Sequence, residues 1–131
     1  MIGIDTNVLV RYLVQDDERQ SVRAAELLER LLTADEPGYV SAVVVVELAW
    51  VLERRYRVDR PQLAAALDWL LSAQNIEVES KAAVSEAISA FKRGRCDFAD
   101  AFIGALALRA GCDHTVTFDK GALMLPGFAP V

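Results

Sequence analysis

Histidine and cysteine are scarce in this chain, which limits the metal sites that it can build. His114 is the single histidine among 131 residues, and Cys96 and Cys112 are the two cysteines. The cysteines lack companions at zinc-ligand spacing, and a zinc site with two histidines is excluded within one chain. Carboxylates remain as the candidate ligands for a metal ion.

Long apolar runs are also absent. The most apolar stretch, "AVVVVELAWVL" at 42–52, is too short to span a membrane and contains Glu47. The first residues lack the basic segment, apolar segment and cleavage site that mark a signal peptide. We therefore expect a cytoplasmic protein that does not associate with a membrane.

Basic residues are fewer than acidic ones. The chain has 14 lysines and arginines against 19 aspartates and glutamates, which gives a net charge of −5. This balance argues against a protein whose whole surface binds nucleic acid. It leaves room for a local basic rim, and several carboxylates gathered in one site would themselves make the charge negative.

The pattern of apolar residues predicts one α/β domain over residues 1–131. Short segments rich in β-branched residues predict strands at 1–5, 38–41, 76–79 and 114–118, and a weaker fifth strand is predicted near "ALMLP" at 122–126. Helical periodicity predicts helices between them, at 6–14, 18–33, 43–56, 60–73, 81–94 and 97–111. This alternation predicts a mainly parallel sheet of four or five strands.

Two carboxylates stand where predicted strands end. Asp5 follows the first strand, and Asp119 follows the strand at 114–118. In open parallel sheets, ligands bind outside the carboxyl ends of the strands. We therefore expect both carboxylates at the same edge of the sheet.

Two further acids, Glu47 and Asp100, have no cation nearby on their own helices. The neighbours of Glu47 three and four residues away are valines and a tryptophan, and Asp97 precedes Asp100 by three residues. An unpaired carboxylate among apolar neighbours is costly unless it is neutralised, reaches water or binds a cation. Gly104, inside the same predicted helix as Asp100, indicates that another segment packs closely there.

Asp5, Glu47, Asp100 and Asp119 thus form a candidate set of hard oxygen ligands. Carboxylates without histidine or cysteine suit Mg²⁺ or Mn²⁺. Such an ion can lower the pKa of a bound water and neutralise a phosphate. The functional interpretation depends on the conjunction of the four acids.

Each acid also has a purely structural interpretation. Asp5 can cap the helix that begins at Thr6, and Glu47 can pair with an arginine such as Arg11. Both interpretations remain open at this stage.

Asp97 and Asp119 likewise have structural interpretations that remain open. Asp97 can be the N-cap of its helix, with Asp100 at the third position of a capping box. Asp119, before Lys120, can be an ordinary turn residue.

Four motifs, in order, resemble the PIN domain family, and within it the VapC-type toxins of bacterial toxin–antitoxin pairs. They span residues 2 to about 120 and are, in order, "IDTNVLVRYL", "VSAVVVVELAWVL", "DFADAFIGALALRAGC" and "TVTFDK". The resemblance implies a three-layer α/β/α sandwich and a metal-dependent endoribonuclease. Gly104 departs from the pattern, because such proteins commonly have alanine there.

The resemblance also implies roles for individual residues. The acids matched to metal ligands are Asp5, Glu47, Asp100 and Asp119, with Asp119 often a weaker ligand. Asp97 matches an extra acid found in a subset of these toxins and is expected to be auxiliary. Small polar residues expected to orient the site are Thr6, Asn7 and Thr117.

Basic residues near the third motif are candidates for contact with RNA phosphates. They are Lys92, Arg93 and Arg95 in "FKRGRC", together with Lys120. Lys92 and Arg93 have an alternative role as solvated cations at the end of a helix. A salt titration of RNA binding separates the two roles.

The resemblance further implies a cognate antitoxin and a homodimer. The stretch "LAAALDWLL" at 63–71 is either a dimer surface or an ordinary core helix.

Two other functions remain open: a receiver-type signalling module that binds Mg²⁺, and a PIN-fold domain that binds a partner without catalysis. The receiver type would require an adjacent acid pair after the first strand, where Asp5 stands alone.

Overall fold

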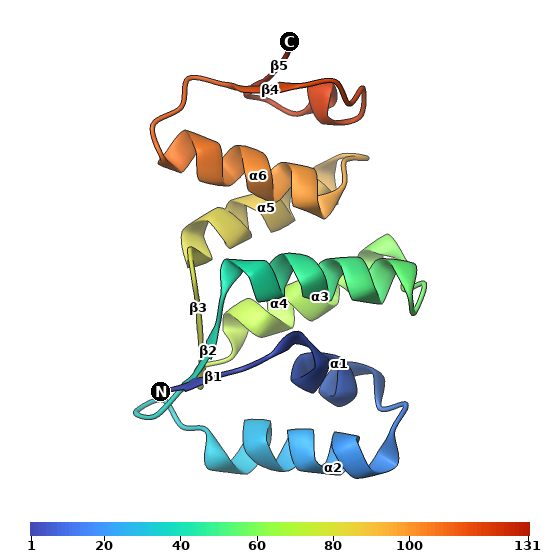
Figure 1. Cartoon of the computed structure of the whole chain (residues 1–131), viewed down its shortest axis with the longest axis vertical. Helices are drawn as coiled ribbons and strands as arrows, with labels where there is room; N and C mark the ends of the chain where they lie inside the picture. The colour runs from blue at the N-terminus through green and yellow to red at the C-terminus, as the bar shows by residue number, and fades with distance from the viewer. The chain divides into compact units, whose positions relative to one another are not determined.

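The computed structural model describes all 131 residues, and they form two compact units (Figure 1). The N-terminal unit comprises Met1–Glu79, and the C-terminal unit comprises Ser80–Val131. Each unit has its own helices, strands and buried side chains, and each is described by itself.

The N-terminal unit contains a three-stranded parallel sheet in the order β1-β2-β3. Its elements follow one another as β1 (Ile2–Gly3), α1 (Thr6–Val14), α2 (Glu18–Glu26), the π-helical turn η1 (Leu27–Leu31), β2 (Gly38–Val40), α3 (Ala42–Arg54), α4 (Arg60–Ser72) and β3 (Ile76–Val78). Helices connect consecutive strands, which is how parallel neighbours are joined.

Polar caps start all four helices of the N-terminal unit. The carboxylates or hydroxyl of Asp5, Asp17, Ser41 and Asp59 accept hydrogen bonds from the first turns of α1, α2, α3 and α4. Asp59 forms a complete capping box with Gln62. These local signals explain why the helix starts were predictable from the sequence.

The core of the N-terminal unit is aliphatic. Its fully buried side chains come from α1, β2, α3 and α4 and are Leu9, Val40, Val45, Leu48, Leu63, Leu67 and Leu70. Trp69 stacks on Tyr12 with ring centroids 5.3 Å apart. The apolar residues of 63–71 therefore belong largely to the core of this unit, which supports the core-helix interpretation over the dimer surface.

The C-terminal unit packs two helices together and ends in a two-stranded parallel sheet, in which β4 and β5 lie side by side (Figure 1). Its elements are α5 (Lys81–Arg93), α6 (Phe98–Arg109), β4 (Thr115–Thr117), the 3-10 turn η2 (Ala122–Met124) and β5 (Phe128–Pro130). Phe91, Phe98 and Phe102 form its aromatic core.

The α/β class and the parallel strands are confirmed, and all six predicted helices are present. The five strands form a three-stranded and a two-stranded sheet, where one sheet of four or five strands was predicted. The strand predicted at 122–126 is wrong. Ala122–Met124 forms a 3-10 turn, closed by the Leu125 amide donating to the Ala122 carbonyl at 2.9 Å. The fifth strand follows Gly127, whose φ of 84° turns the chain into Phe128–Pro130.

The helix predicted at 18–33 ends differently from expectation. Its second half is the π-helical turn η1, in which the Leu32 amide donates to the Leu27 carbonyl at 3.0 Å. No helix of the structure is both long enough and apolar enough to cross a membrane.

Candidate metal centre

Asp5 lies between β1 and α1, where its carboxylate caps α1. Its Oδ1 accepts a hydrogen bond from the Thr6 amide at 2.8 Å, so the capping interpretation is confirmed. Asp5 is nevertheless exposed, and its other carboxylate oxygen takes no hydrogen bond. A capped helix start therefore still presents a carboxylate oxygen that is available to a ligand.

Glu47 of α3 faces the same small cavity as Asp5. We name this cavity of about 140 Å³ the acid pocket; its lining residues include Asp5, Asn7, Arg11, Glu47 and Arg55. Glu47 is exposed and makes no hydrogen bond or ion pair. It avoids the expected desolvation cost by reaching water, and it remains available to a cation.

The proposed pairing of Glu47 with Arg11 is wrong. The Arg11 guanidinium donates from Nη1 to Asp16 Oδ1 at 3.1 Å and from Nε to Gln20 Oε1 at 2.6 Å. Tyr56 Oη accepts from Arg11 at 3.3 Å and donates to Asp16 at 2.7 Å. This network engages the guanidinium with acceptors other than Glu47.

Thr6 and Asn7 differ in their surroundings. Thr6 is buried, and its Oγ1 has no hydrogen-bond partner in the structure. Asn7 is exposed on the first turn of α1 and lines the acid pocket. An unpaired buried hydroxyl and an exposed amide beside two carboxylates are polar groups that a hydrated ion can use.

The C-terminal unit gathers three acids, Asp97, Asp100 and Asp119. Burial raises the pKa of Asp100 above its usual value, and the negative charges of Asp97 and Asp119 and a hydrogen bond with Asp119 raise it further. No cation is among the causes of this shift. The site therefore contains repulsion that a bound cation would relieve.

Asp97 occupies the N-cap position of α6, as predicted, but its side chain makes no capping hydrogen bond. The capping box expected with Asp100 is therefore absent. Asp100 lies in the first turn of α6, where the helix dipole favours negative charge. Both carboxylates are left without the local hydrogen bonds that the structural interpretation required.

Thr117 and Asp119 form a tight turn after β4. The Asp119 amide donates to Thr117 Oγ1 at 3.0 Å, and Asp119 Oδ1 accepts from the Gly121 amide at 2.9 Å. The turn interpretation of Asp119 is thus confirmed. The bond from the Gly121 amide orients the Asp119 carboxylate, whose charge contributes to the raised pKa of Asp100.

The donor set fits a hard divalent cation by its chemistry. Asp5 and Glu47 belong to the N-terminal unit, and Asp97, Asp100 and Asp119 belong to the C-terminal unit. Within either unit, no group of three or more acidic, histidine or cysteine side chains has the geometry to hold a metal ion. Each unit contains carboxylates of a kind that suits a hard cation, and those of neither unit form a complete site by themselves.

The predicted basic residues lie in the same unit as Asp97, Asp100 and Asp119, which we name the Asp97 cluster. Lys92 and Arg93 form the last turn of α5, which supports their interpretation as helix-terminal cations. Arg95 follows in the connection to α6, and Lys120 follows Asp119; both are exposed.

Arg11 and Arg55 also line the acid pocket, although neither was predicted as a site residue from the sequence. One signal was available, because Arg11 follows Asn7 by four residues on the same helix. Arg55 is the C-cap residue that directly follows α3. Both arginines bring positive charge beside the carboxylates.

The sequence profile of the PIN domain family matches residues 2–124 of the chain. This chain belongs to the PIN domain family. A VapC ribonuclease from Aquifex aeolicus (strain VF5) is 26% identical over 117 residues, which cover 89% of this chain and 86% of the relative. The match to a PIN domain leaves the receiver-type interpretation without support.

Proposed function

We propose that this PIN domain protein is an endoribonuclease that depends on Mg²⁺ or Mn²⁺ and acts as the toxin of a toxin–antitoxin pair. The observation that carries the proposal is the set of carboxylates without cation partners: Glu47 beside Asp5, and Asp100 beside Asp97 and Asp119. The similarity to a VapC ribonuclease supports RNA as the substrate.

We propose that Asp5, Glu47, Asp100 and Asp119 act on the same metal, with Asp97 auxiliary, and that residues 1–131 form one domain. One family profile runs through both units, which supports this proposal. The bound ion would supply a polarised water and neutralise phosphate charge. The residues of the chain hold the carboxylates in place, through the Thr6 amide for Asp5 and the Gly121 amide for Asp119.

The experiment is RNA cleavage with and without Mg²⁺. We expect Asp5→Asn and Asp100→Asn each to lower the rate at least 100-fold, because each removes a charged ligand. Asp35→Asn and Asp113→Asn are matched controls, since both residues are exposed acids outside the acid pocket and the Asp97 cluster. Cleavage by Asp5→Asn and Asp100→Asn at the control rate would contradict the proposal.

The proposal extends to RNA contacts and to protein partners. We propose that four basic residues contact RNA phosphates: Arg95, Lys120, Lys92 and Arg93. We also propose that the protein is a cytoplasmic homodimer and that it binds an antitoxin. Growth arrest on expression, absent for Asp5→Asn and relieved by a co-expressed partner, tests the toxin role. Light scattering at dilute concentration tests the dimer, and a monomer would contradict it.

A further inference from the structure

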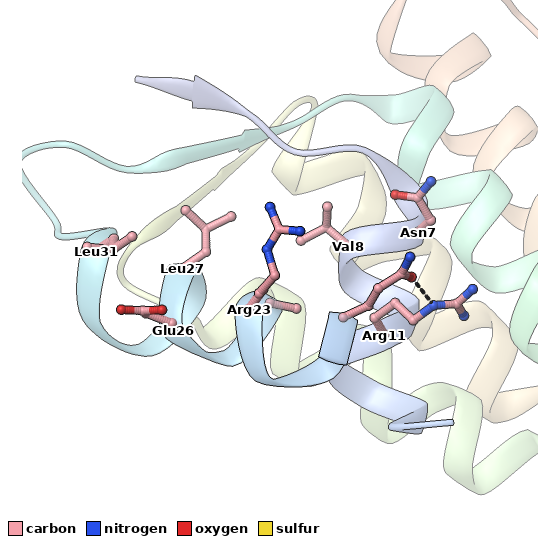
Figure 2. Close-up of a pocket in the computed structure, with 9 residues that line it drawn as sticks. Asn7, Val8, Arg11, Arg23, Glu26, Leu27 and Leu31 are labelled. Atoms are coloured by element: carbon pink, nitrogen blue, oxygen red, sulfur yellow. Dashed lines mark hydrogen bonds between the residues drawn. The ribbon is translucent and has the colours of Figure 1, made fainter. Parts of the chain in front are cut away.

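A groove runs between α1 and the segment formed by α2 and η1 (Figure 2). We name it the arginine groove; its volume is about 460 Å³, and Arg11 and Arg23 line it together with Val8, Leu27 and Leu31. In Figure 2 the Arg23 side chain extends from α2 between the side chains of Leu27 and Val8. This volume lies in the range of ligand-binding clefts, about 300–1,000 Å³.

The arginine groove and the acid pocket share a wall. Asn7 and Arg11 line both cavities, and all residues of both belong to the N-terminal unit. A chain that places one group beside Asp5 and Glu47 can therefore continue past Asn7 and Arg11 into the groove.

The charges of the groove favour an anion. Arg23 is exposed and makes no hydrogen bond or ion pair. Arg11 is fixed through Nε and Nη1, which leaves its Nη2 without a protein acceptor. Glu26 is the one acid that lines the groove, and Arg11 is ion-paired with Asp16, so Arg23 is the guanidinium that is free to bind an anion.

The apolar part of the groove favours a ligand that also has flat apolar surface. Leu31 is 63% exposed although it follows Leu28 and Leu27 in a helical turn, and it forms the end of the groove. Phosphates beside bases and sugars present this combination, and arginine is well suited to bind phosphate.

We propose that the arginine groove binds single-stranded RNA next to the cleaved phosphodiester. Arg23 and Arg11 contact phosphates, and Leu27 and Leu31 contact a base or sugar. The proposal rests on the proposed ribonuclease function and adds to it a substrate subsite in the N-terminal unit.

The test measures binding of a fluorescent single-stranded RNA of about 12 nucleotides to the full chain in EDTA, where the metal-dependent reaction is absent. We expect Arg23→Gln to weaken binding about 3- to 10-fold and to reduce the salt slope by roughly 0.7, the value for one phosphate contact on a single strand. Arg30→Gln is the matched control, because Arg30 is an exposed arginine of η1 that does not line the groove. Glu26→Gln should tighten binding.

The outcomes separate the subsite from the function. If the wild-type protein cleaves RNA while Arg23→Gln binds RNA as tightly as Arg30→Gln, the proposal that the groove binds RNA is overturned and the proposed ribonuclease function is not. Wild-type protein that neither binds nor cleaves RNA would overturn both proposals. A peptide of alternating glutamate and leucine that loses affinity for Arg23→Gln, with RNA binding unchanged, would assign the groove to a protein partner and overturn the RNA proposal.

Discussion

At the scale of single residues, the sequence predicted roles whose partners are close along the chain. The bond from the Thr6 amide to Asp5 and the bond from the Gly121 amide to Asp119 span one and two residues, and both followed from local rules. The partners of Arg11, which was offered as one possible partner of Glu47, were not predictable in this way because they lie 5, 9 and 45 residues away. The choice among distant acceptors depends on tertiary packing.

Asp100 provides a test of the metal site that does not depend on catalysis. Its pKa is raised by burial and by Asp97 and Asp119. A carboxyl whose pKa is higher in the folded than in the unfolded protein destabilises the fold at pH values above the folded pKa, and this penalty disappears as the pH falls through the two values. Replacement by asparagine should therefore stabilise the metal-free protein at neutral pH.

We expect Asp100→Asn to raise the melting temperature in EDTA by about 3 °C at pH 7.5, roughly the shift for 1 kcal/mol in a domain of this size. The gain should shrink as the pH falls, because wild-type Asp100 then binds its proton. Mg²⁺ should stabilise the wild type and the control Asp113→Asn but leave Asp100→Asn unchanged. A lower melting temperature of Asp100→Asn in EDTA would show that the carboxylate supports the fold.

Gly104 was predicted to mark close packing, and the structure identifies the neighbour. A Cβ added at Gly104 would lie 2.5 Å from Cε2 of Phe128. We expect Gly104→Ala to cost about 1 kcal/mol by urea unfolding, because overpacking exceeds the gain in helix propensity. Most of this cost should disappear in the Phe128→Leu background, and equal costs in both backgrounds would contradict the packing argument.

At the scale of elements, helix and strand positions were largely predictable because caps and apolar spacing are local. The two exceptions have non-local causes. The π-helical turn η1 receives a hydrogen bond from Asn75 Nδ2 to the Leu28 carbonyl at 2.6 Å, across 47 residues. β5 forms where Phe128–Pro130 pairs with Thr115–Thr117, and no pattern within "ALMLP" or after it encodes this partner.

The hydrogen bond from the Asn75 side chain to the Leu28 carbonyl predicts that Asn75 stabilises η1. Asn75→Ala would leave the Leu28 carbonyl without this donor, and we expect a loss of about 1–2 kcal/mol in the free energy of unfolding. Gln74→Ala is the matched control, since Gln74 is an exposed amide residue without a hydrogen bond. Urea unfolding followed by circular dichroism compares the two variants. Equal stability would show that η1 forms without the Asn75 side chain.

At the scale of the whole molecule, the α/β class was predictable from the alternation of elements, and family membership confirms it. The complete metal site was not derivable from either unit alone, because its proposed ligands are divided between the N-terminal unit and the C-terminal unit. The proposal of one metal site therefore depends on the proposal that the two units form one domain. Cooperative unfolding is its direct test.

The two units contain separate natural probes. Both tryptophans, Trp50 and Trp69, belong to the N-terminal unit, so fluorescence reports that unit. Cys96 is buried in the C-terminal unit, and its thiol becomes reactive when that unit unfolds; Cys112 is exposed and is replaced by serine to isolate the signal. Because a single small domain unfolds in one transition, we expect both probes to change at the same urea concentration. Two separate midpoints would show that the units are independent domains, and the proposal of a single domain would then fail.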